Sequence, residues 1–159
     1  MLNVRILCVG KLKEAYWRDA CAEYAKRLKA FCSFSIVELP ESRLPDDPSQ
    51  ALIDKALEEE GEKLLTAAKG SAMIPLCIEG KEMTSPKLAT TLEELASRGV
   101  SSVSFVIGSS FGLAEKVKQA GSLRLSMSPM TFPHQLARVM LCEQIYRAFQ
   151  IQNHGKYHK

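Results

Sequence analysis

The sequence has no long hydrophobic run. Its longest stretch without a charged residue, 99–114, covers 16 residues and contains five serines, whereas a membrane-spanning helix needs about 18 or more consecutive apolar residues. The apolar start of the chain has no basic segment before it and no small-residue cleavage site after it, so it is expected to be a strand and not a signal peptide. We therefore expect a cytoplasmic protein without a membrane segment.

Closely spaced cysteines are also missing. The five cysteines are odd in number, widely scattered and set among apolar neighbours, and they form no C-x-x-C pair. Zinc sites need closely spaced ligand pairs, so no metal is expected, and the interpretation we favour is buried thiols in a reducing compartment. The five are Cys8, Cys21, Cys32, Cys77 and Cys142.

Phosphate-binding motifs are absent as well. The segment 107–113, IGSSFGL, has two glycines and two serines after an apolar run, but it matches neither G-x-G-x-x-G nor a Walker A sequence. This disfavours dinucleotide and triphosphate binding. Glycines at a strand end can still let a ligand approach free backbone N–H groups, and a simple tight turn is the alternative.

What the sequence does have is the composition of a folded domain. Its 159 residues are 46% hydrophobic and 25% charged, which suits a single globular domain over residues 1–159. An acidic run from Glu58 to Glu62 is interpreted as solvated helix surface.

Apolar runs alternate with segments of helical periodicity along the chain. This alternation predicts an α/β fold with a mostly parallel sheet and helices on both faces, in which ligands bind at the carboxyl ends of the strands. Strands are expected at 2–9, 34–39, 72–78, 100–107 and 123–127. Helices are expected at 14–30, from an N-cap at Ser49 to Ala68, from an N-cap at Ser85 with Pro86 at the first position, at 114–119 and at 133–152. The loops that would form the ligand site are 79–84, 108–113 and 126–133.

Positive charge is concentrated at the C-terminal end. Residues 1–120 carry 16 basic and 17 acidic side chains, whereas residues 121–159 carry five basic side chains and one acidic side chain. The five are Arg124, Arg138, Arg147, Lys156 and Lys159. Either a solvated helix face with a basic tail or an anion-binding surface explains this distribution.

The loop 126–133 and the chain terminus stand out for their residue types. Two prolines stiffen a loop of Met, Thr and Phe, which suits an adenine ring better than a sugar or a metal. His134 follows in the first turn of a helix, where the helix dipole favours a neutral imidazole able to accept a proton; a packed or capping histidine is the alternative. At the terminus, Tyr157 and His158 between two lysines could bind an unpaired base and its phosphates, unless the tail is simply frayed.

Five segments together closely resemble one bacterial family, the 23S rRNA pseudouridine N3-methyltransferases (ribosomal RNA large subunit methyltransferase H) of the SPOUT, or α/β-knot, superfamily. The segments are GKLKEAYWRDACAEYAKRL (10–28), LCIEGKEMTS (76–85), FVIGSSFGL (105–113), LSMSPMTFPHQLARVMLCEQIYRAF (125–149) and YHK (157–159). They are spread over essentially the whole length of the chain.

This resemblance implies a C-terminal trefoil knot, a homodimer and S-adenosylmethionine (SAM) as the methyl donor, with S-adenosylhomocysteine as its product. The implied substrate is a pseudouridine in a hairpin loop of 23S rRNA at the bridge between ribosomal subunits, methylated on N3 in assembled 70S ribosomes. The family's cofactor contacts fall on Leu76, Gly108, Met127, Ser128, Pro129, Met130, Thr131 and Phe132.

The chain departs from the family pattern at two positions. Ser109 stands where the family usually has glycine, and we expect it to be tolerated if its φ angle is negative. Pro129 replaces a residue that is commonly basic, which should weaken contacts to RNA or to a carboxylate without abolishing SAM binding.

The candidate catalytic residues are His158, Tyr157 and His134. Because the methyl donor is already activated, the enzyme must mainly hold N3 at attack distance and help its proton leave, without any metal. His158 and Tyr157 are the first candidates for that assistance, and His134 would position the substrate together with Arg147. RNA contacts are expected from Arg138, Arg147, Lys156 and Lys159. A non-catalytic ribosome-assembly factor and a doubly wound nucleotide-binding protein are the alternatives.

Overall fold

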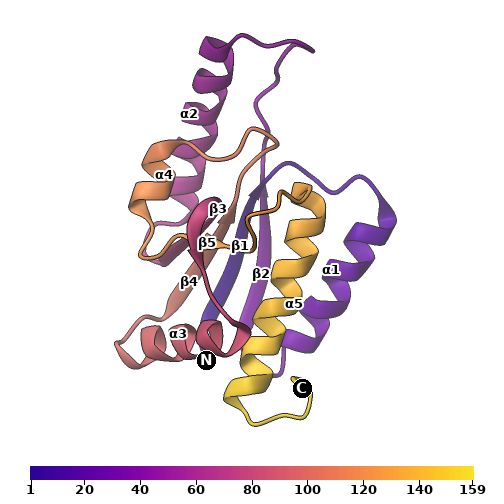
Figure 1. The fold of residues 1–159 in the computed structure, drawn as a ribbon, viewed down its shortest axis with the longest axis vertical. Coiled ribbons are helices and arrows are strands. Elements are labelled where there is room, and N and C mark those ends of the chain that lie inside the picture. The colour runs from indigo at the N-terminus through magenta and orange to yellow at the C-terminus, as the bar shows by residue number, and fades with distance from the viewer.

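Five parallel strands form one sheet in the order β2-β1-β4-β3-β5. The computed structural model describes residues 1–159 (Figure 1). The strands are β1 (Asn3–Val9), β2 (Ser33–Leu39), β3 (Ala72–Glu82), β4 (Ser102–Ile107) and β5 (Leu125–Ser126). The helices are α1 (Ala15–Leu28), α2 (Gln50–Ala67), α3 (Ser85–Ser97), α4 (Glu115–Ala120) and α5 (His134–Gln152).

Helices cover both faces of the sheet, as predicted. Strand β1 shows why: Val4 and Ile6 point into a core shared with α1, α3 and α5, whereas Leu7 and Val9 point into a second core shared with α2 and α4. Successive side chains of a strand alternate between faces, so a continuous apolar run such as β1 requires cover on both. Figure 1 shows α2 and α4 on one side of the strands and α1 and α5 on the other.

The helix starts agree with the sequence analysis at α2 but not at α3. Ser49 caps α2 by accepting a hydrogen bond from the N–H of Leu52 at 3.3 Å. The N-cap of α3 is Thr84 and not Ser85, because the Thr84 hydroxyl accepts from the N–H of Lys87 at 3.2 Å. The Ser85 hydroxyl instead bonds to Gln144 of α5 at 2.6 Å, a long-range partner that a local pattern does not reveal.

Strand β3 contains a bulge that shapes the edge of the sheet. Both Leu76 and Lys81 pair with Leu125 of β5, so residues 77–80 bulge out of the ladder. A Cβ atom at Gly80 would lie 2.9 Å from the backbone carbonyl carbon of Arg124, so only glycine permits this close approach of the two chains. The prediction of a strand ending at Ile78 was therefore four residues too short, because β3 resumes pairing after the bulge.

Arg138 is buried, which overturns its predicted role in RNA contact. Its side chain is 2% exposed, and Nη1 lies 2.7 Å from Oε2 of Glu38 while Nη2 donates to the carbonyl of Gly10 at 3.2 Å. The same Glu38 carboxylate accepts from the N–H of Leu12 at 3.3 Å. Arg138 thus joins α5 to β2 and to the loop that follows β1.

We predict that Arg138→Met lowers the free energy of unfolding by about 3 kcal/mol, the lower end of the range for breaking a buried ion pair, because water can reach part of Glu38. Urea unfolding at one fixed protein concentration measures the change. Arg27→Met, which breaks an exposed pair with Glu23, should cost less than about 1 kcal/mol. An Arg138→Met variant that is no less stable than the Arg27→Met variant would contradict this account of α5.

Candidate functional site

A cleft of about 600 Å³ opens at the carboxyl ends of β3, β4 and β5. Its walls come from the β3 bulge, the loop 108–113, the loop 126–133 and the first turn of α5. The volume lies within the usual range for small-molecule sites. The cleft therefore lies where the loops of a parallel sheet are expected to bind a ligand.

All of the predicted cofactor residues except Pro129 line this cleft. The lining members are Leu76, Gly108, Met127, Ser128, Met130, Thr131 and Phe132, and His134 joins them. Pro129 is exposed and lies outside the lining. The structure thus brings together residues from three segments that the sequence separates.

The backbone geometry of the loop 108–113 requires glycine at two positions. A Cβ atom at Gly108 would lie 2.2 Å from the carbonyl oxygen of Gly112, and Gly112 has a φ angle of +90°. The N–H of Gly112 donates to the carbonyl of Ser109 at 2.9 Å, which closes the turn. A side chain at Gly108 would therefore displace the turn rather than only fill the cleft. The φ angle of Ser109 is not positive, which was the condition for a serine to replace the family's glycine here.

Behind this loop lies a buried carboxyl group that the sequence analysis placed in solvent. Glu60 of α2 is 4% exposed, and its Oε2 accepts from the N–H of Ser42 at 3.0 Å. Burial raises the pKa of Glu60, although the N–H of Ser42 and the hydroxyl of Ser109 each act to lower it. Glu60 thus faces the inside of the protein, unlike the rest of the acidic run of α2.

The cleft has an apolar rim. Ile78, at the β3 bulge, is 53% exposed and Met130 is 72% exposed, and both belong to the lining. The N–H of Met130 donates to the hydroxyl of Ser128 at 3.0 Å, which fixes the bend of this loop. Large exposed apolar groups around a cleft are typical of surfaces that a ligand or a partner covers.

The sequence analysis did not predict an ion pair in the cleft. Lys118 of α4 and Glu79 of the bulge form an ion pair, and both line the cleft. The Lys118 ammonium group, through this hydrogen bond, holds the pKa of Glu79 below its usual range. Their separation of 39 residues in the sequence hides this contact from any local pattern.

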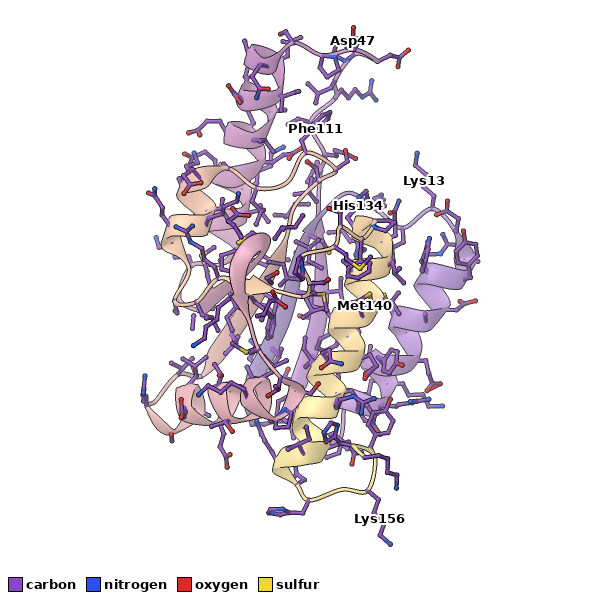
Figure 2. The ribbon with its side chains drawn as sticks, viewed as in Figure 1. Lys13, Asp47, Phe111, His134, Met140 and Lys156 are labelled. Atoms are coloured by element: carbon purple, nitrogen blue, oxygen red, sulfur yellow. The ribbon has the colours of Figure 1, made fainter.

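The predicted catalytic residues of the tail lie far from His134. Helix α5 has 19 residues and is about 27 Å long at a rise of about 1.5 Å per residue. His134 is at its first turn beside the cleft, whereas the tail folds back at its far end. Figure 2 shows His134 and Lys156 at opposite ends of this helix. Within one chain, the structure therefore does not bring His134 together with Tyr157 and His158.

The tail itself is packed against α5 and is not frayed. The Tyr157 ring meets the ring of Tyr146 edge to face at 4.8 Å, and the Arg147 guanidinium lies over Tyr157 at 4.7 Å. Nη1 of Arg147 is 3.1 Å from Nδ1 of His158, and the N–H of Gly155 donates to the carbonyl of Gln150 at 2.8 Å. Tyr157, His158 and Arg147 thus form one ordered group.

The structure has neither a metal-binding cluster nor a membrane-spanning helix. No group of three or more His, Cys, Asp or Glu side chains is placed so as to hold a metal ion. None of the helices combines the length and the hydropathy that crossing a membrane requires.

Comparisons with known proteins relate the whole chain to one group. A family model described as "Predicted SPOUT methyltransferase" matches residues 2–158. A protein of Exiguobacterium sibiricum named ribosomal RNA large subunit methyltransferase H is 45% identical over 99% of this chain and 100% of its own length. The protein of the same name from Bacillus pumilus is 46% identical over the same shares. The solved structure of a probable methylase family protein from Haemophilus influenzae aligns with 99% of this chain and 71% of its own chain, with a TM-score of 0.58 and 16% sequence identity. At this identity the similarity concerns the fold alone.

We predict that Cys77 alone among the five thiols reacts with N-ethylmaleimide in the folded protein. Cys77 is half-buried in the cleft lining, whereas the other four are buried, and burial raises the pKa of Cys8 to about 12 and of Cys32 to about 11. Burial also raises the pKa of Cys77, so its thiolate fraction is small at neutral pH and its rate of labelling should rise as the pH increases. Mass spectrometry of the alkylated protein measures this, and labelling of Cys8 or Cys32 before unfolding would contradict the described packing.

Proposed function

The chain belongs to the SPOUT methyltransferase family, and on this premise we propose that it transfers a methyl group from SAM to N3 of a pseudouridine in 23S rRNA. The relatives that match over their full length are named ribosomal RNA large subunit methyltransferase H, which supports ribosomal RNA as the substrate. The observation that carries the proposal is the cleft, which gathers the predicted cofactor residues from three segments of the chain. Since ribosomes are its substrate, the protein would act in the cytoplasm.

The chemistry of the cleft fits an uncharged adenosine with an amino-acid extension. Backbone groups of the loops 108–113 and 126–133 can bond to the edge of an adenine ring, while Leu76 and Phe132 offer apolar contact to its faces. SAM has no phosphate, which agrees with the absence of a phosphate-binding motif. We also propose that these two loops belong to the trefoil knot of the family.

The residues of the chain have two tasks in the proposed reaction. When bound, SAM supplies a methyl group activated by a sulfonium, and the N3–CH₃ bond forms as the S–CH₃ bond breaks. The cleft walls hold the donor, and basic groups hold the RNA so that N3 lies in line with the S–CH₃ bond. A base must take the N3 proton, and His158, Tyr157 and His134 are the candidates.

The distance between the tail and the cleft leads us to propose a composite site in a homodimer. Tyr157 and His158 of one chain pack against Tyr146 and Arg147, which lie about 18 to 20 Å along α5 from His134, so the tail of the second subunit would meet the cleft of the first. A smaller cleft beside α5 is lined by Met83, Met127 and Met140, and methionine side chains adapt easily to a partner surface. Lys156 and Lys159 are exposed and would contact RNA phosphates beside the site. Arg147 would contact them too, through the part of its guanidinium group that does not pair with Glu143.

We predict that the protein binds one SAM per chain and that Thr131→Trp weakens this binding at least about tenfold, because the new ring occupies the cleft. Thr131 is exposed, so the melting temperature should stay near that of the wild type. Pro129→Trp adds the same ring two residues away, outside the lining, and is the matched control. Isothermal titration calorimetry gives both affinities. A wild-type protein that does not bind SAM would contradict the proposed methyltransferase activity and favour an RNA-binding assembly factor. Equal effects of the two variants would show that SAM does not bind in this cleft.

The composite site predicts complementation between two inactive chains. One chain carries Thr131→Trp and the other lacks residues 157–159. With SAM well below the dissociation constant of the Thr131→Trp chain, each alone should have little activity on ribosomes from a strain without the modification. Mixed in equal amounts and allowed to exchange subunits, they should recover about a quarter of the wild-type rate, because half of the dimers are mixed and each has one complete site.

The truncated chain should still bind SAM, which serves as the control for this experiment. Mass measurements can show that mixed dimers have formed. If methyl incorporation then stays at background, the tail and the cleft of one chain must belong to the same site.

A further inference from the structure

Two opposite charges face each other at one end of the cleft. Glu79 is the only carboxylate and Lys118 the only lysine or arginine in its lining. Lys118 is 19% exposed and Glu79 is 52% exposed, and the two are ion-paired. The loops 108–113 and 126–133 contribute only apolar, hydroxyl and backbone groups to the cleft, so this pair is the one strongly polar feature of its lining.

The local fold directs both side chains to this place. Glu79 lies in the β3 bulge, which leaves the ladder between Leu76 and Lys81, and bulges of this kind redirect side chains next to functional sites. On α4, Lys116 pairs with Glu58 and Glu62 of α2, whereas Lys118, two residues later, turns to the cleft. The two lysines of one helix thus have separate tasks, since residues two apart lie on different faces.

We infer that Glu79 and Lys118 hold the amino-acid end of the methyl donor. The Lys118 ammonium group would bind the α-carboxylate of the ligand, and the Glu79 carboxylate would bind its α-ammonium group. This inference rests on the proposed function, because it assigns one end of the donor to one end of the cleft. An α-amino acid carries both charges on adjacent carbons, so it can insert beside an existing ion pair with each charge next to its opposite.

The charge balance of the cleft agrees with this assignment. The pair has no net charge, and neither does the zwitterionic amino-acid group, so the amino-acid end adds no uncompensated charge near the apolar lining. Lys118 keeps the pKa of Glu79 low, which favours the carboxylate form that the ligand's ammonium group needs. A ligand without an amino acid, such as 5′-methylthioadenosine, would fill the adenosine part of the cleft and leave the pair untouched.

The experiment compares two ligands with three variants. S-Adenosylhomocysteine and 5′-methylthioadenosine share the adenosine and the thioether, and only the first has the amino acid. Lys118→Gln and Glu79→Gln should each weaken binding of S-adenosylhomocysteine at least about tenfold in calorimetry. They should change binding of 5′-methylthioadenosine less than about threefold. Lys116→Gln, on the same helix but outside the cleft, should change neither affinity, and thermal melting confirms that each variant is folded.

The outcomes separate this inference from the function on which it rests. Equal weakening of both ligands in Lys118→Gln, or no weakening of either, would overturn the inference while leaving the methyl-donor site in place. A wild-type protein that binds neither ligand would overturn the proposed function, and the inference with it.

Discussion

The buried ion pair between Arg138 and Glu38 determines where α5 lies on the sheet. Arg138 also donates to the carbonyl of Gly10, so one side chain fixes this helix to the second strand and to the loop after the first. The first turn of α5 then closes the cleft at the carboxyl ends of the strands, and its last turn carries the tail to the other end of the molecule. Within one chain, the length of α5 therefore separates His134 from His158.

The cleft combines an apolar lining with a single ion pair, and this combination favours a ligand with two ends of different character. Backbone and apolar groups of the loops 108–113 and 126–133 suit a neutral heterocycle, whereas Glu79 and Lys118 suit a zwitterion. SAM has both parts, joined through the sulfur that carries the methyl group. Adenosine nucleotides have phosphates in place of the amino acid, and the cleft offers neither a phosphate-binding loop nor an excess of positive charge for them.

The sequence predicts the order of elements well because that order depends on local patterns. Hydrophobic periodicity indicated the strands and helices, and the strand-end rule indicated the loops around the cleft. Contacts between distant segments could not be predicted in this way. Arg138 was assigned to RNA because it belongs to the basic C-terminal segment, and only the structure places Glu38, 100 residues earlier, against it. The β3 bulge and the pairing of Glu79 with Lys118 could not be predicted for the same reason, because register shifts and ion pairs between elements leave no periodic signal in the sequence.

We propose above that the chain methylates a ribosomal pseudouridine with SAM. The most direct measurement is nucleoside analysis by mass spectrometry of 23S rRNA, from ribosomes that lack the modification, after incubation with the purified protein and SAM. The account predicts one new methyl group, located on N3 of a pseudouridine, at a level that depends on added SAM. A methyl group on another nucleoside would contradict the proposed substrate, and the absence of any new methyl group, with SAM bound to the protein, would contradict the enzyme.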